Sequence, residues 1–250
     1  MRNSSNPVFK NELFKTRTVD GQVMTVNGTI NKTIILLILA LVTAAWTWMR
    51  FSSATLVSEN TAAGVAAGIA AVQPYMIGGL IAGLILALVA FFKPRTAPFT
   101  APLYAIAEGF ALGGISAIFE VRYPGIVIQA VGLTFATMAV MLFLYRSRLI
   151  RVTNKLRTGI MAATGGILLI YLADMVMGFF GGSIGLISSG FSLLVVGIAA
   201  FNLLLDFDFI ERASANGASQ KMEWLGALAL MVTLVWLYME LLRLLSKLRR

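Results

Sequence analysis

Acidic side chains lie inside the longest apolar runs of this 250-residue chain. A charged group at the depth of a bilayer core is unfavourable by roughly a few kcal/mol or more, so such residues usually face a bundle interior and usually have a function. Protonation, a shared proton or a bound cation would each reduce this energy. We therefore expect a pathway for cations or protons lined by Glu108, Asp174, Asp206, Asp208 and Glu240.

The stretch FNLLLDFDFIER places Asp206 and Asp208 at the end of one apolar run. Asp206 is predicted to be a buried, titrating gate residue. Asp208 is turned about 200° around a helix from Asp206, so it is an accessory acid or merely an interfacial one. Glu240, within the last apolar run, lines the pathway or reaches toward the outer surface.

The absence of two residue types limits the reactions and metal sites that the side chains can support. The chain has no Cys and no His, which excludes disulfides, thiolate chemistry, the commonest metal ligand and the commonest proton shuttle. Carboxylates remain as the side chains that titrate near neutrality when buried. We predict no resident cofactor, with Ca²⁺ only as a permeating ion.

The composition is that of an integral membrane protein. Hydrophobic residues make up 58% of the chain, charged residues 12%, and the mean hydropathy is +0.85, whereas a water-soluble domain needs far more polar surface. A helix of roughly 20 apolar residues crosses a bilayer. We predict an all-α membrane protein with a polar cytoplasmic tail over residues 1–32 and one membrane domain over 33–250, with spans near 33–49, 74–92, 101–119, 125–145, 157–178, 184–209 and 224–246.

The connections between these runs carry packing and boundary signals. Prolines lie at or near several span boundaries, where they end or open helices. Residues 51–73 are expected to form the longest connection, with AAGVAAGIAA as a re-entrant or surface segment. Glycines at 79 and 83 and at 109 and 113 have the spacing that lets neighbouring helices approach closely.

The distribution of Lys and Arg predicts orientation. With the N-terminus inside, 14 of the 20 basic residues lie in the tail and the inner loops, so the N-terminus is expected to be cytoplasmic. The net charge of +9 is spread over tails and loops, which favours anionic lipid headgroups and not nucleic acid as the partner. Seven spans would leave the basic C-terminus outside, unless the last segment turns back.

Depth along the spans groups the acids in two layers. With a rise of about 1.5 Å per residue, Glu108 lies roughly 10 Å from its cytoplasmic end, and Asp206 and Asp208 lie within roughly 8 Å of theirs. Asp174 and Glu240 lie roughly 25 Å away and would form an outer layer. No Lys or Arg lies at mid-span to neutralise these acids.

Five stretches carry a resemblance to a known family: SNPVFK at 5–10, MTVNGTINKT at 24–33, AEGFALGGISAIFE at 107–120, LLLDFDFIE at 203–211 and LYMELLRLL at 237–245. The chain resembles the Bax inhibitor-1/YccA family, in a bacterial branch. This resemblance implies a seven-helix bundle with the last helix central. It also implies a pH-sensitive calcium leak gated by two aspartates on the last two helices, in the bacterial inner (plasma) membrane.

The family pattern falls on particular residues here. Asp206 matches the first acid through D-x-x-x-I, and Glu240 matches the second after Leu237 and Tyr238. The second acid is Glu, and the family's partner arginine on the second helix has no counterpart in 74–92. Straight helices turning near residue 216 would hold the two acids about 20 Å apart. Either a helical extension over 211–223 shifts the register, or Asp206 pairs with Glu108.

The expected function is therefore a pH-sensitive calcium leak channel in which close acids share a proton at low pH and release it to open. Asp206 and Glu240 would then be transient Ca²⁺ ligands, because Ca²⁺ prefers oxygen. The alternative is a non-transporting regulator or partner of a membrane protease or another membrane complex. An enzyme is not expected, because His and the Gly-x-Gly-Asp signature of intramembrane aspartyl proteases are both absent.

Overall fold

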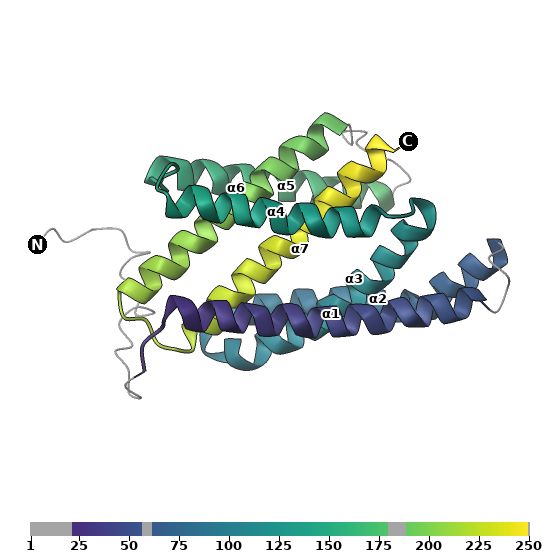
Figure 1. The fold of residues 1–250 in the computed structure, drawn as a ribbon, viewed down its shortest axis with the longest axis horizontal. Coiled ribbons are helices and arrows are strands. Elements are labelled where there is room, and N and C mark those ends of the chain that lie inside the picture. Colours follow the sequence, from purple (N-terminus) through teal and green to yellow (C-terminus); the bar gives the residue numbers. More distant parts are fainter. Residues whose placement is uncertain (1–21, 57–61, 180–188, 250) are drawn as a thin grey trace, which may run out of the picture.

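The computed structural model describes residues 22–56, 62–179 and 189–249, which form a bundle of long helices (Figure 1). They are α1 (Val26–Leu56), α2 (Ala62–Phe92), α3 (Ala97–Arg122), α4 (Ile126–Arg146), α5 (Asn154–Phe179), α6 (Ser189–Ala215) and α7 (Met222–Leu248), with a 3₁₀ turn, η3 (Pro94–Thr96), before α3. The shortest, α4, has 21 residues, and all seven are long and apolar enough to cross a membrane. The predicted all-α, seven-helix membrane fold is confirmed.

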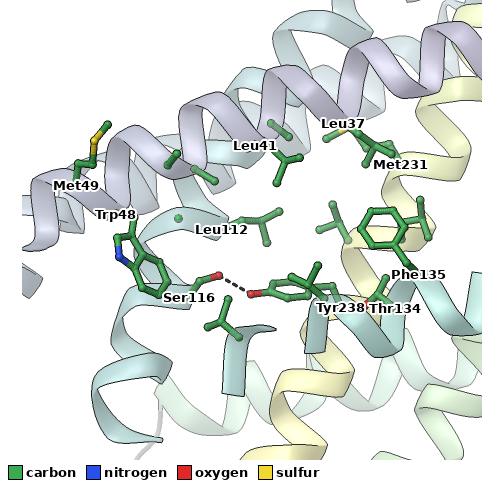
Figure 2. Close-up of a pocket in the computed structure, with 18 residues that line it drawn as sticks. Leu37, Leu41, Trp48, Met49, Leu112, Ser116, Thr134, Phe135, Met231 and Tyr238 are labelled. Carbon is green, nitrogen blue, oxygen red and sulfur yellow. Dashed lines mark hydrogen bonds between the residues drawn. The ribbon is translucent and has the colours of Figure 1, made fainter. Parts of the chain in front are cut away.

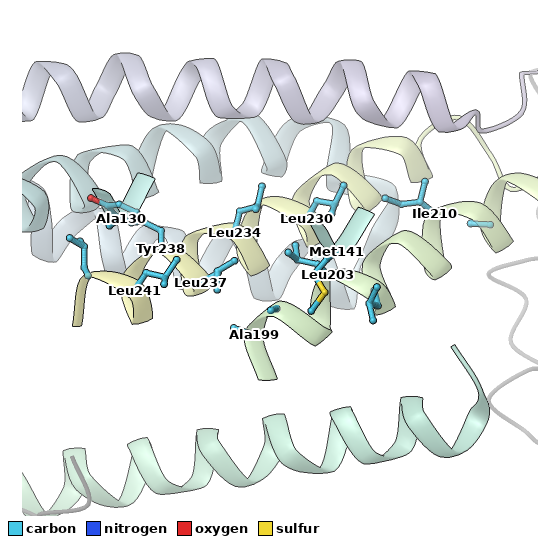
Figure 3. Packing of buried hydrophobic residues seen from close by; sticks show 14 of the residues in the cluster. Ala130, Met141, Ala199, Leu203, Ile210, Leu230, Leu234, Leu237, Tyr238 and Leu241 are labelled. Atoms are coloured by element: carbon cyan, nitrogen blue, oxygen red, sulfur yellow. The ribbon is translucent and has the colours of Figure 1, made fainter. Parts of the chain in front are cut away.

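Helix α7 is central, as the resemblance implied. It packs against α1, α3, α4 and α6 and passes between α1 and α4 in Figure 1. Leu230, Leu234 and Leu237 follow the spacing of one helix face and pack with Leu203 of α6 and Met141 of α4 (Figure 3). Lipid tails are as apolar as leucine, so the hydrophobic effect does not drive the helices together within a bilayer. Close van der Waals packing of this kind stabilises the bundle instead.

Helix α3 is held closely between α1 and α2 by glycines. A Cβ atom added at Gly113 would lie 2.7 Å from the Cα atom of Ala44 on α1. A Cβ atom added at Gly79 of α2 would lie 3.0 Å from the backbone nitrogen of Ala111 on α3. The predicted close approach of neighbouring helices at these glycines is confirmed, and α1, α2 and α3 form one tightly packed layer.

The expected connection over residues 51–73 is wrong. Helix α1 continues to Leu56 and α2 begins at Ala62, so AAGVAAGIAA is the first part of α2 and Pro74 lies inside that helix. The small residues allow this because Gly68 packs against α1, where its added Cβ would lie 3.0 Å from the ring of Phe51. Residues 57–61 lie outside the described part of the chain.

The two ends of the described chain lie at opposite ends of the bundle. The Met24 amide donates to the carbonyl of Ala218 in the α6–α7 turn at 2.7 Å. At the other end, Arg249 Nη1 donates to the carbonyl of Pro124, before α4, at 2.7 Å. Because α7 is one continuous helix between these ends, the last segment does not turn back. Of the expected 1–32 tail, residues 1–21 lie outside the described residues.

Candidate functional site

Asp206 lies on α6 where that helix packs against α7. The Thr233 side chain, on α7, lies beside the Asp206 carboxyl group. Asp206 Oδ2 is buried and has no hydrogen-bond partner among the described residues. Leu203, Leu204 and Ile210 are buried around it in the core shared with α7 and α4, so an apolar helix face positions the acid.

Glu240 lies deep in α7 with 1% of its surface exposed. Its Oε1 accepts hydrogen bonds from the Tyr171 hydroxyl of α5 at 2.7 Å and from Arg243 Nη1 at 2.9 Å. Arg243 also donates to the Tyr171 hydroxyl at 2.8 Å. Glu240 Oε2 is buried without a partner among the residues described, so one oxygen of this carboxylate is neutralised and the other is not.

Asp208 has a different environment from Asp206. Arg157 of α5 donates to Oδ2 at 2.5 Å, and Arg212, one turn along α6, donates to Oδ1 at 2.8 Å. The Asp208 side chain is 8% exposed, so it is a buried ion-pair partner joining α5 to α6. The expectation that no basic residue would neutralise the acids does not hold for Asp208 or Glu240, because arginines nearer the helix ends reach inward.

Glu108 lies on α3 and faces α2. A Cβ atom added at Gly83 would lie 2.8 Å from its Oε2 atom and 3.7 Å from the ring of Tyr104. The structure describes no hydrogen bond between Glu108 and Asp206: Asp206 lies against Thr233 of α7, and Glu108 faces α2. Asp174 is half-buried on α5, one turn beyond Tyr171, and thus at the same end of the bundle as Glu240.

The comparison with protein families decides the identity of this bundle. The model of the family described as Bax inhibitor 1 like matches residues 6–250. The chain belongs to the Bax inhibitor 1 like family. It is a multi-pass membrane protein of a family that is not known as enzymatic. Neither the curated proteins nor the solved structures contain a match to this chain.

In this Bax inhibitor 1 like protein, Asp206 and Glu240 do not form a direct pair. Asp206 lies level with Thr233, seven residues before Glu240, or about 10 Å along α7. The expected separation of about 20 Å was too long, because α6 continues to Ala215 and the turn to α7 extends to residue 221, which moves the antiparallel register toward Glu240. The shift shortens the separation of Asp206 and Glu240 but does not bring the two carboxyl groups into contact.

The acids of this family member are distributed and not clustered. Among the described residues, no group of three or more His, Cys, Asp or Glu side chains lies close enough to hold a metal ion. Asp206 and Glu240 therefore lie at separate depths of the bundle and not in one cluster of ligands.

Sequence reasoning missed one buried acid in this Bax inhibitor 1 like chain. Glu223, at the start of α7, is 2% exposed and forms an ion pair with Lys32 of α1. Its Oε1 also accepts hydrogen bonds from the Thr25 amide at 2.8 Å and the Thr25 hydroxyl at 3.0 Å. Gly28 fits against the same carboxylate. The family-like segment MTVNGTINKT thus surrounds Glu223, a long-range contact that local spacing does not indicate.

Proposed function

We propose that this protein is a pH-sensitive calcium leak channel in which Asp206 and Glu240 are the gating acids. The observation that carries the proposal is the pair of unpartnered, buried carboxyl oxygens, Asp206 Oδ2 and Glu240 Oε2. A buried polar atom without a partner needs an explanation. For a carboxyl oxygen, the explanations are a proton, a water molecule or a cation, and all three belong to an ion pathway.

The gating steps follow from the separation of the two acids. At low pH the Asp206 carboxyl group is neutral and stays within closely packed helices, so the pathway is closed. At higher pH it becomes an anion, which favours hydration, and Asp206 and Glu240 then offer oxygen ligands to Ca²⁺. Because about 10 Å separates them along α7, Asp206 and Glu240 lie in series along the pathway and do not share one proton.

The same proposal gives the protein an orientation and a location. We place the N-terminus in the cytoplasm, because 14 of the 20 Lys and Arg residues lie in the tail and the loops on the same side. The resemblance to the bacterial branch of the family supports the inner (plasma) membrane of a bacterial cell as the location. The mechanism needs no enzymatic step and no resident cofactor. The partners are the bilayer, Ca²⁺ and protons.

The experiment is Ca²⁺ entry into proteoliposomes between pH 5 and pH 8. Wild-type flux should rise with pH, and Asp206→Asn and Glu240→Gln should each remove most of that dependence. Glu211→Gln is the matched control, because Glu211 is an exposed acid on α6 and its change should leave the profile intact. Wild-type flux no greater than that of empty liposomes at every pH would contradict the channel.

The alternative function, a non-transporting regulator of a membrane protease or another membrane complex, is supported by the anchored N-terminal segment. Residues 22–24 pair with the α6–α7 turn, through Met24 to Ala218 and Gln220 to Gln22, so the described chain begins in contact with the start of α7. Deleting residues 1–20 should abolish regulation of a partner and leave Ca²⁺ flux largely unchanged. Loss of flux with regulation preserved would contradict this function.

A further inference from the structure

A groove separates α1 from α4 on the side of the bundle. These two helices make no extensive contact with each other, although both pack against α7. Between them is a cavity of about 440 Å³ with α3 and α7 as its floor. Figure 2 shows Leu41 and Met49 of α1, Leu112 of α3, Phe135 of α4 and Met231 of α7 around it.

The lining of the groove is almost entirely apolar. None of its lining residues is charged. The hydroxyl groups of Ser116 and Tyr238 hydrogen-bond to each other at 2.6 Å, as Figure 2 shows. The Thr134 hydroxyl donates to the carbonyl of Ala130 at 2.7 Å. Because these hydroxyls are already satisfied, the groove suits an occupant that is hydrocarbon.

The groove opens sideways, toward the part of the surface that a bilayer would cover. Leu41, Met49 and Phe135 are 60%, 61% and 41% exposed, and all three lie within membrane-spanning helices. Along α1 the lining runs from Leu37 to Met49, or about 18 Å. Half of a hydrocarbon core of about 30 Å is about 15 Å, so the groove matches the depth of one leaflet.

The size of the groove selects one kind of occupant. At roughly 30 Å³ for a water-sized group, the cavity of about 440 Å³ holds on the order of fifteen such groups, as in one acyl chain. A helix segment about 10 Å across and about 18 Å long would occupy roughly 1,400 Å³, which is more than the cavity holds. A single lipid chain therefore fits in length, volume and chemistry, whereas a helix of a second copy fits in chemistry alone.

We propose that the α1–α4 groove binds one acyl chain of a phospholipid from the leaflet at the Met49 end of α1. The bound chain lies against Met231, Leu234 and Tyr238 of α7 and so completes the packing of the central helix. This site is independent of the proposed ion pathway, because its lining includes none of the acids. A lipid at this position is a part of the folded bundle and does not exchange freely with the annular lipid.

The test is native mass spectrometry of the full chain, reconstituted in vesicles of phosphatidylethanolamine and phosphatidylglycerol and extracted in mild detergent. Ala44→Phe and Ala45→Phe fill the groove from α1. Ala136→Phe adds the same bulk at an exposed position of α4 outside the lining. The wild type and Ala136→Phe should retain one phospholipid per chain, and the two groove variants should retain at least tenfold less.

Three results would overturn the proposal. Equal phospholipid retention in all four proteins shows that the lipid binds elsewhere. A dimer that dissociates in Ala45→Phe shows that a second copy occupies the groove, and a retained free fatty acid shows a different source of the chain. A measurement without a groove-filling change is the quenching by brominated phospholipid of Trp48, which lines the groove, in a chain whose other three tryptophans are replaced by Phe. It should saturate at a fraction of brominated lipid at least threefold lower than the quenching of a tryptophan introduced by Ala136→Trp, and equal saturation contradicts the site.

Discussion

Removing the Glu223 carboxylate should detach the segment before α1 from the start of α7. Glu223 accepts two hydrogen bonds from Thr25 and forms an ion pair with Lys32. The side chains of Lys32 and Glu223 are 16% and 3% exposed. Breaking a buried ion pair costs about 3–5 kcal/mol. Because Lys32 can still reach water, we expect Glu223→Ala to lower the free energy of unfolding by about 3 kcal/mol.

Removing the cation of this ion pair instead of the carboxylate should lower the free energy of unfolding further. Lys32→Met leaves the less exposed partner, Glu223, without its cation, so we expect a loss of about 4 kcal/mol. The double variant removes both charges and should cost less than the sum of the two single changes, by roughly 2 kcal/mol. Glu211→Gln, at an exposed acid of α6, is the matched control and should change the free energy of unfolding by less than about 1 kcal/mol.

Two assays measure these changes. Equilibrium unfolding in mixed micelles gives the free energies, and hydrogen exchange follows the Met24 amide, which donates to Ala218 at 2.7 Å. A loss of about 3 kcal/mol corresponds to exchange roughly a hundredfold faster. If Met24 exchanges within threefold of the wild-type rate in Glu223→Ala, Glu223 does not hold the segment and the reasoning is refuted.

Two further predictions test the packing and the ion pairs. Gly113→Leu should lower the free energy of unfolding by about 3 kcal/mol, because its Cβ atom would lie 2.7 Å from the Ala44 backbone; Gly132→Leu, with open space around it, should cost less than about 1 kcal/mol in the same unfolding assay. Asp208→Asn should lower the free energy of unfolding by only about 2 kcal/mol, because its partners Arg157 and Arg212 are partly exposed. The result should be faster hydrogen exchange in α5, and unchanged exchange there would contradict the role of this ion pair.

The helices could be predicted because hydropathy and length are local properties. Each apolar run is long enough to cross a bilayer by itself, and prolines mark the start of η3 and of α3. The start of α2 could not be predicted in this way, because AAGVAAGIAA is too short to cross a bilayer by itself and its helix is supported by Phe51 and Thr55 of α1. That support depends on tertiary packing.

The acids could be found from the sequence, but their partners could not. A carboxylate within an apolar run is visible by inspection, as Asp206 and Glu240 were. Thr233 and Tyr171 become partners only through the register of neighbouring helices, which sequence spacing does not fix. Arg212 and Arg243 lie four and three residues from Asp208 and Glu240, so the rule for side chains that are neighbours on one helix face would have identified both ion pairs.

The contacts at the two ends of α7 limit how this helix can move. Glu223 ties its first turn to Lys32 of α1, while Lys247 donates to Ser192 of α6 at 2.5 Å and Arg249 donates to the Pro124 carbonyl. Sliding α7 along its own axis would break both sets of contacts together. Bending in the middle, or a shift of α5, which makes none of these end contacts, breaks neither. Helix α7 is therefore the fixed axis of the bundle, and a conformational change should be sought in the helices that surround it.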